Sequence, residues 1–280
     1  MSPLTQADSP LRARLPLLLA ALAVLVVAIA GGLIATAGAA RSVELGKTKS
    51  NPKPNCPTPK AIENGAPPNR EDEFCQVNGD VTGFQRSVEG KKGLFRVPSD
   101  GHIVAWSVRL SKPSKDERDA FGGLAKSDRY GEKPTAGVSI LRKTDGQRYR
   151  LMRKSPIVTV QNYYGEQPVF TLNTPLKVNE GNVVAMSTLT WLPNLAAKNQ
   201  KKNTVWQGSR TQKKFPDANP NDGVRSCDLP GNLTQEERGP YFFANSSAHK
   251  KVGSERKYGC QYRRARLMYW AYFVPKGNAG

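Results

Sequence analysis

The sequence predicts an all-β fold, an antiparallel two-sheet β-sandwich of jelly-roll type with one or two short helices, preceded by an N-terminal hydrophobic helix. Two observations support this prediction. From about Phe74 onward, short runs rich in β-branched and aromatic residues alternate with turn residues, and helix signals are few. Closely spaced strands of this kind are typical of sandwiches and jelly rolls. The runs cover residues 81–85, 93–97, 102–110, 136–141, 149–152, 157–160, 169–172, 183–189, 204–206, 258–262 and 266–274.

Two of these runs carry more detailed expectations. Asp145-Gly146 lies between the runs 136–141 and 149–152, and this dipeptide predicts a hairpin. The run 102–110 reads HIVAWSVRL. Strict alternation along a strand then places one set of side chains on a single face: Val104, Trp106, Val108 and Leu110.

The helix signals are capping boxes. Ser114 and Glu117 have the spacing in which each side chain caps the other's backbone N–H, and Pro113 precedes them. This predicts a short helix over about 114–125. Thr234 and Glu237 have the same spacing and mark a second candidate helix start.

The N-terminus predicts export. Arg12 and Arg14 precede an uncharged apolar run, 15–40, which ends in small residues. A basic start, an apolar middle and a small-residue end describe a signal peptide, with cleavage after Ala39 or Ala40. The alternative is an uncleaved signal anchor, because residues 15–35 form a helix of about 31 Å that spans a bilayer core. Either outcome places the rest of the chain outside the cytoplasm, secreted or tied to the outer face of the cytoplasmic membrane.

The chain then divides into segments. Residues 1–40 form the signal peptide or anchor, residues 41–73 a Pro-rich linker, and residues 74–275 the β-sandwich domain. A long basic excursion with one strand interrupts that domain at 191–240. An even number of cysteines in an exported domain indicates disulfides. Three connectivities are open; short loops flanked by Pro and Gly favour Cys56 with Cys75 and Cys227 with Cys260.

The charge predicts an anionic partner. The formal net charge is +19, of which residues 1–40 supply +1, so the exported part carries about +18. Outside the cytoplasm the available polyanions are cell-wall polymers, acidic glycans and lipid headgroups, and nucleic acid is not expected. Basic residues gather around 142–154, in the excursion and at 250–266. The candidate ligand surface combines aromatic and basic residues of the excursion: Trp191, Lys198, Lys201, Lys202, Trp206, Arg210, Lys213 and Lys214.

Four phrases resemble a group of uncharacterised exported proteins of high-GC Gram-positive bacteria. They are FRVPSDGHIVAWSVRL, VSILRK with RYRLMRKSP, PLKVNEGNVVAMSTLTWLP and YGCQYRRARLMYWA, and the resemblance spans 81–274. It also extends loosely to lectin-like and jelly-roll sandwiches. The resemblance implies a fold and no activity.

No catalytic, cofactor or metal motif stands out, so the sequence favours a non-enzymatic envelope module that binds an anionic or saccharide ligand. One alternative is a hydrolase of envelope polymers, which needs two facing carboxylates, for example among Asp116, Glu117 and Asp119. The other alternative is a purely structural envelope protein with no ligand.

Overall fold

The structure is a computed structural model that describes residues 42–56, 75, 77–209 and 248–277. These residues belong to one unit that begins at Ser42. No helix within these ranges is long and apolar enough to cross a bilayer. The predicted export segment, 15–35, lies outside the described residues, and so does the second candidate helix start at Thr234.

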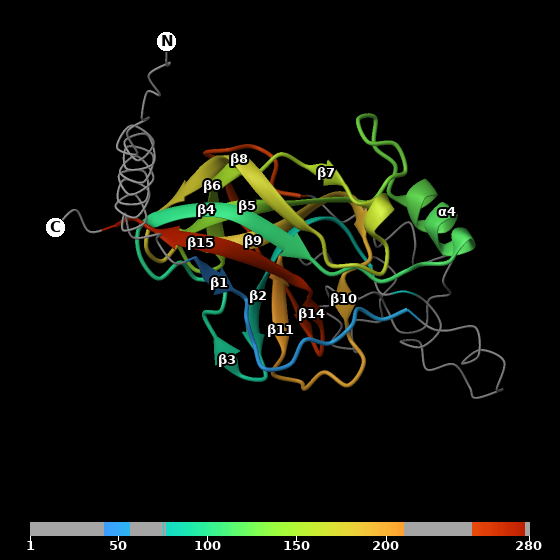
Figure 1. Cartoon of the computed structure of the whole chain (residues 1–280), viewed down its shortest axis with the longest axis horizontal. Helices are drawn as coiled ribbons and strands as arrows, with labels where there is room; N and C mark the ends of the chain where they lie inside the picture. Colours follow the sequence, from blue (N-terminus) through green and yellow to red (C-terminus); the bar gives the residue numbers. More distant parts are fainter. Residues whose placement is uncertain (1–41, 57–74, 76, 210–247, 278–280) are drawn as a thin grey trace, which may run out of the picture. The chain divides into compact units, whose positions relative to one another are not determined.

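The larger sheet consists of antiparallel neighbours in the order β12-β6-β5-β9-β2-β11-β13, with β3 added to β2 and β7 to β5. Its strands β2, β5, β6, β9 and β11 are labelled in Figure 1. Strand β9 lies in its middle and is buried along almost its whole length. The strands are β2 (Asn78–Val88), β3 (Lys91–Lys92), β5 (Thr135–Lys143), β6 (Arg148–Lys154), β7 (Val158–Thr159), β9 (Val183–Leu192), β11 (Val205–Gly208), β12 (Glu255–Lys257) and β13 (Cys260–Arg263).

A second sheet has the antiparallel order β1-β15-β4-β8, and β10 pairs with β14 as a separate ribbon. The described part contains one α-helix, α4, so the predicted all-β antiparallel fold is confirmed. The remaining elements are β1 (Val43–Leu45), β4 (Gly101–Val108), α4 (Lys115–Leu124), the 3₁₀ turn η2 (Gln161–Tyr163), β8 (Val169–Val178), β10 (Leu195–Ala196), β14 (Arg266–Leu267) and β15 (Tyr269–Pro275).

The two larger sheets contribute to one hydrophobic core. Trp106 on β4 and Ile140 on β5 belong to the same cluster of buried side chains. Tyr269 on β15 donates a hydrogen bond from its hydroxyl to the carbonyl of Val184 on β9, at 2.9 Å, and its ring stacks on Phe95 at 4.1 Å between centroids. A hydroxyl buried this deeply needs such an acceptor, so this bond fixes β15 against β9.

Strand β4 departs from strict alternation. Val104 has no partner in either neighbouring strand, and the pairing shifts there on both sides. One additional residue in a strand reverses the inward and outward faces beyond it. As a result Ile103 lies in the core together with Trp106 and Val108, while Val104 is half-buried. Beyond this bulge the predicted set holds, since Trp106, Val108 and Leu110 all lie in the core, whereas the placement of Val104 with them was wrong.

Local signals predicted two elements correctly. Helix α4 begins after Ser114, whose side chain accepts from the backbone N–H of Glu117, and the Glu117 carboxylate accepts from the backbone N–H of Ser114. This is the predicted capping box. The predicted hairpin joins β5 to β6, with the Arg148 N–H donating to the Asp145 carbonyl at 2.6 Å and Gly146 at a positive φ of 48°.

The predicted linker was wrong in its first part. Residues 43–45 form β1, which pairs with β15, and Leu45 is buried. Farther along, Asn55 donates its backbone N–H to Leu195 and accepts at its side chain from the backbone N–H of Lys198. The Pro and Asn content of this segment is typical of a linker, yet the segment is hydrogen bonded to the β domain at several points.

Two further predictions need correction. Residues 93–97 form a turn and one isolated bridge, Arg96 with Val183, instead of a strand. The predicted excursion begins with more regular structure than expected, because β9 continues to Leu192 and β10 follows. Its one predicted strand, 204–206, is confirmed as β11, which lies in the large sheet between β2 and β13. Residues 210–240 of the excursion lie outside the described part.

Candidate functional site

The predicted ligand surface at 191–214 is not formed as expected. Trp191 and Trp206 are 1% and 2% exposed, so their assignment to an exposed aromatic strip was wrong. Trp206 stacks on Tyr262 at 4.0 Å within the large sheet. The structure describes three lysines of this set, and all three are exposed: Lys198, Lys201 and Lys202. The Nζ of Lys201 lies 3.7 Å from a carboxylate oxygen of Glu89. The other three residues lie outside the described part: Arg210, Lys213 and Lys214.

A different basic surface does form. Strand β12 pairs with β6, which is hydrogen bonded to β5, and this pairing joins two basic segments, 142–154 and 250–257. The register places four of their cations on one side of the sheet, and we call them the basic face: Arg142, Arg148, Arg150 and Lys257. Within the two segments ten basic residues stand against two acids, Asp145 and Glu255. The ten are Arg142, Lys143, Arg148, Arg150, Arg153, Lys154, Lys250, Lys251, Arg256 and Lys257.

The register sets like charges opposite each other. Arg142 on β5 is the direct partner of Arg150 on β6, and Arg148 on β6 is the partner of Lys257 on β12. Directly opposed side chains share one side of a sheet and lie about 5 Å apart at Cβ, where like charges repel. Glu255 relieves part of this repulsion by pairing with Arg150 at 2.6 Å. The Arg148 and Lys257 pair has no such acid in its row.

Beneath the basic face, aromatic packing holds β6 and the segment after residue 247 to the core. Tyr258 is fully buried and contacts both Tyr149 and Phe84, with ring centroids 5.1 Å and 6.0 Å away. His249 is also buried, with Nδ1 3.2 Å from the Tyr258 hydroxyl and Nε2 3.0 Å from Ser254 Oγ. Burial, and then the charge of Arg256, lower the pKa of His249. A neutral histidine in these bonds is therefore a structural support of the face.

A cavity of about 480 Å³ lies beside α4. Trp191 lines it, and its indole N–H donates to the Glu132 carbonyl at 2.8 Å, while Phe121 and Tyr164 pack on the ring. The remaining lining is mostly polar and charged. The residues around the cavity are Arg118, Asp119, Glu132, Lys133, Pro134, Gln161, Tyr164 and Trp191.

The charges of this cavity are unevenly compensated. Asp119 is paired with Lys115 at 2.5 Å and Glu132 with Lys126 at 3.8 Å, and neither lysine lines the cavity. Arg118 and Lys133 have no acidic partner among the residues that the structure describes. Within the described part of the chain, Arg118 and Lys133 are therefore the charged lining residues that form no ion pair.

The Arg118 side chain is held in place. One guanidinium N–H donates to the Pro113 carbonyl at 2.7 Å, and the guanidinium carbon lies 5.6 Å from the centre of the Tyr164 ring. Burial raises the pKa of Tyr164 to about 12, although the charge of Arg118 acts in the opposite direction. The phenol is therefore protonated at neutral pH and available as a hydrogen-bond donor.

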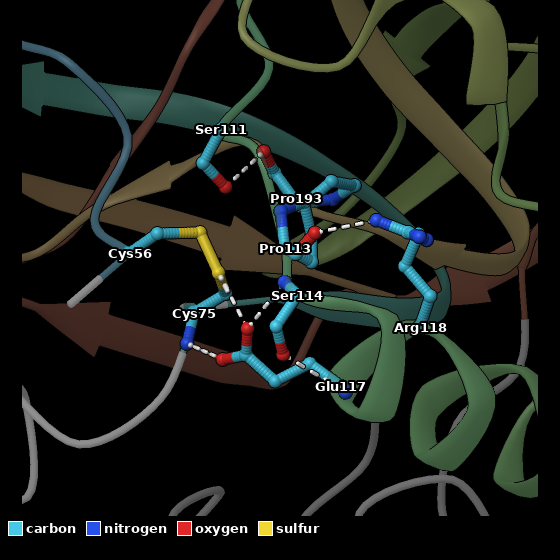
Figure 2. Close-up of a disulfide and its surroundings, with 8 residues drawn as sticks. All are labelled: Cys56, Cys75, Ser111, Pro113, Ser114, Glu117, Arg118 and Pro193. Carbon is cyan, nitrogen blue, oxygen red and sulfur yellow. Dashed lines mark hydrogen bonds between the residues drawn. A yellow bond between two sulfur atoms is a disulfide. The ribbon is translucent and has the colours of Figure 1, made fainter. Parts of the chain in front are cut away.

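The start of α4 is tied to a disulfide (Figure 2). Cys56 and Cys75 are bonded, as the short-loop argument predicted. The Glu117 carboxylate accepts from the backbone N–H of Cys75 at 2.7 Å and from that of Ser114 at 2.8 Å, so one side chain caps the helix and fixes the bridge. Cys260 is buried and also disulfide-bonded. Its predicted partner, Cys227, lies outside the described residues.

Fold and site together define an antiparallel β protein with a basic sheet face, a disulfide-tethered helix and a charged cavity beside that helix. Comparisons with protein-family models, with curated proteins and with solved structures find no match.

Proposed function

We propose that this protein is an exported cell-envelope module that binds an anionic polymer, a wall polymer or an acidic glycan, through its basic face. The observation that carries the proposal is the alignment of Arg142 with Arg150 and of Arg148 with Lys257 across three strands. Such pairs destabilise a free sheet, and a polyanion that lies across them removes the repulsion. A ligand with regularly spaced charges therefore fits this surface.

The charge of the chain favours the same class of ligand. A net charge of about +18 outside the export segment draws polyanions from a distance, and each neutralised ligand charge releases counterions. At physiological ionic strength the attraction extends about 8 Å, so the local density of the basic face decides where the ligand binds. The basic face has more cations than the group of Lys198, Lys201 and Lys202, and its cations lie directly opposite one another on neighbouring strands.

We further propose a two-sheet sandwich architecture and an extracytoplasmic location. The bond from Tyr269 to Val184 and the shared core support two facing sheets. The Cys56–Cys75 bridge agrees with an oxidising compartment, and the apolar run 15–35 supplies the export signal or the anchor. In this account the basic face meets the wall on the outer side of the membrane.

A binding assay tests the proposed function. Full-length protein in non-ionic detergent is titrated with polygalacturonate, an acidic glycan, and with dextran as a neutral glycan, across a salt series. We expect polygalacturonate to bind with an affinity that falls linearly on a log–log plot against salt, and dextran not to bind. Absent or salt-insensitive binding of the acidic glycan would exclude electrostatic recognition by the basic face.

A further inference from the structure

The geometry points to a second binding site, separate from the basic face: we propose that the cavity beside α4 binds a small molecule bearing a carboxylate or phosphate group. Its volume of about 480 Å³ lies in the range of small-molecule sites, about 300–1,000 Å³. Part of its wall is the buried ring of Trp191 on β9, which packs against Phe121 and Tyr164. The cavity is therefore formed by the core of the fold as well as by surface residues.

The balance of charge selects an anion. The cavity's two acids are each satisfied by a lysine from outside it, Asp119 by Lys115 and Glu132 by Lys126. Arg118 and Lys133 form no ion pair within the described residues, and Tyr164 and Gln161, whose side chains carry hydrogen-bond donors, also line the cavity. A donor-rich, half-buried site of this kind favours a group with several acceptor oxygens, and an oxyanion has them.

Arg118 supplies the geometric selectivity. A guanidinium binds carboxylates and phosphates through two parallel N–H···O bonds, which an ammonium does not reproduce. Because the Pro113 carbonyl and the Tyr164 ring already hold Arg118, little side-chain freedom is lost when a ligand binds. The helix that carries Arg118 is itself fixed by the contact between Glu117 and Cys75 at its first turn (Figure 2).

The cavity and the basic face are independent sites. Lys133 and Pro134 of the cavity directly precede β5, whereas Arg142 of the basic face lies at the other end of that strand. A strand rises about 3.3 Å per residue, so the two ends of β5 are about 26 Å apart, several screening lengths at physiological salt. Each site can therefore be changed without altering the other.

Calorimetric titration of the full-length protein tests the proposal. The probes are glucuronate and glucose 6-phosphate, which carry a carboxylate and a phosphate, and glucose as their neutral counterpart. We expect saturable binding of at least one anion and none of glucose. Arg118→Gln and Lys133→Gln should each weaken that binding at least about tenfold, because each removes a charged hydrogen-bond donor. Arg142→Gln, a matched loss of charge on the basic face, should leave it unchanged.

The outcomes separate clearly. Preference for glucuronate assigns a carboxylate site and preference for glucose 6-phosphate a phosphate site. Lys133 is exposed and caps no element, so Lys133→Gln should fold normally. It therefore tests the site independently of any effect of Arg118→Gln on folding. The proposal is overturned by no saturable binding of either anion, by equal binding of glucose, or by Lys133→Gln binding as tightly as the unaltered protein.

Discussion

The carboxylate of Glu117 accepts a hydrogen bond from the backbone N–H of Cys75, 42 residues away in the chain. The same carboxylate caps α4 through the backbone N–H of Ser114. One side chain therefore links the disulfide to the helix that lines the cavity. Helix α4 is short, ten residues, and helices of that length depend on caps and tertiary contacts for their stability.

Glu117→Ala should consequently loosen α4. The half-buried N–H of Cys75 and the exposed N–H of Ser114 both lose their acceptor, and we expect a loss of about 1–2 kcal/mol in the free energy of unfolding. Urea denaturation measures the total loss in the free energy of unfolding. Amide hydrogen exchange shows whether that loss is concentrated in α4. Asp116→Ala, at the neighbouring exposed acid, is the control and should change stability much less. Equal effects of the two variants would remove the proposed role of Glu117.

The disulfide itself should contribute more. Cys56 and Cys75 are 19 residues apart, and a bridge over a loop of this length stabilises the folded state by roughly 3 kcal/mol through loss of chain entropy in the unfolded state. The variant Cys56→Ser/Cys75→Ser should therefore unfold at a lower urea concentration, and its free energy of unfolding should be smaller by that amount. A variant as stable as the original would mean that segment 43–56 is held by its backbone contacts alone.

His249 predicts a pH dependence of stability. Its pKa in the folded protein is lowered by burial, so the unfolded chain takes up a proton at higher pH than the folded chain does. Stability is then complete above about pH 6.5, the ordinary histidine value, and is lost as the pH falls below it. Urea unfolding at pH 7.5 and at pH 5.5 measures this loss. The two values lie about one unit above and below the ordinary histidine pKa of about 6.5.

His249→Gln should reduce the difference in stability between the two pH values, since glutamine retains hydrogen-bonding capacity without titrating. His102→Gln, a change at an exposed position of β4, provides the matched control. A His249→Gln variant that keeps the full difference would show that other groups cause the pH dependence.

Removing one arginine from the basic face should stabilise the protein. Arg142→Gln ends the repulsion with Arg150, and we expect a gain of up to about 0.5 kcal/mol at low salt. At about 1 M salt, where charges are screened within 3 Å, the gain should disappear. Lys143→Gln is the control, because its direct partner is the uncharged Tyr149. Equal gains from both variants would show that net charge, and not the alignment with Arg150, causes the effect.

The sequence predicted those elements that depend on neighbouring residues. The capping box at Ser114 and the Asp145-Gly146 turn act over three or four residues, so their geometry follows from local chemistry. The tryptophans show the limit of such reasoning. Trp206 lies among polar residues in the sequence, yet β11 is enclosed by β2 and β13, and this enclosure depends on pairings that span many residues.

The basic face required long-range pairing for the same reason. Arg150 and Glu255 are 105 residues apart, and only the pairing of β6 with β12 makes the two basic segments one surface. The sequence identified both segments as basic and gave no register between them. It also offered β-type composition for 93–97, where a turn forms, and linker composition for 43–45, where a strand forms.

Two triple variants with equal loss of charge test the central claim most directly. One removes Arg142, Arg148 and Lys257 from the basic face and leaves the ion pair of Arg150 with Glu255 intact; the other removes Lys198, Lys201 and Lys202, each residue becoming Gln. Polygalacturonate affinity is measured across the salt series for both. We expect the variant of the basic face to lose about three units of salt slope and most of its affinity, while the variant of Lys198, Lys201 and Lys202 binds nearly as the unaltered protein does. Equal losses in the two variants would contradict the central claim.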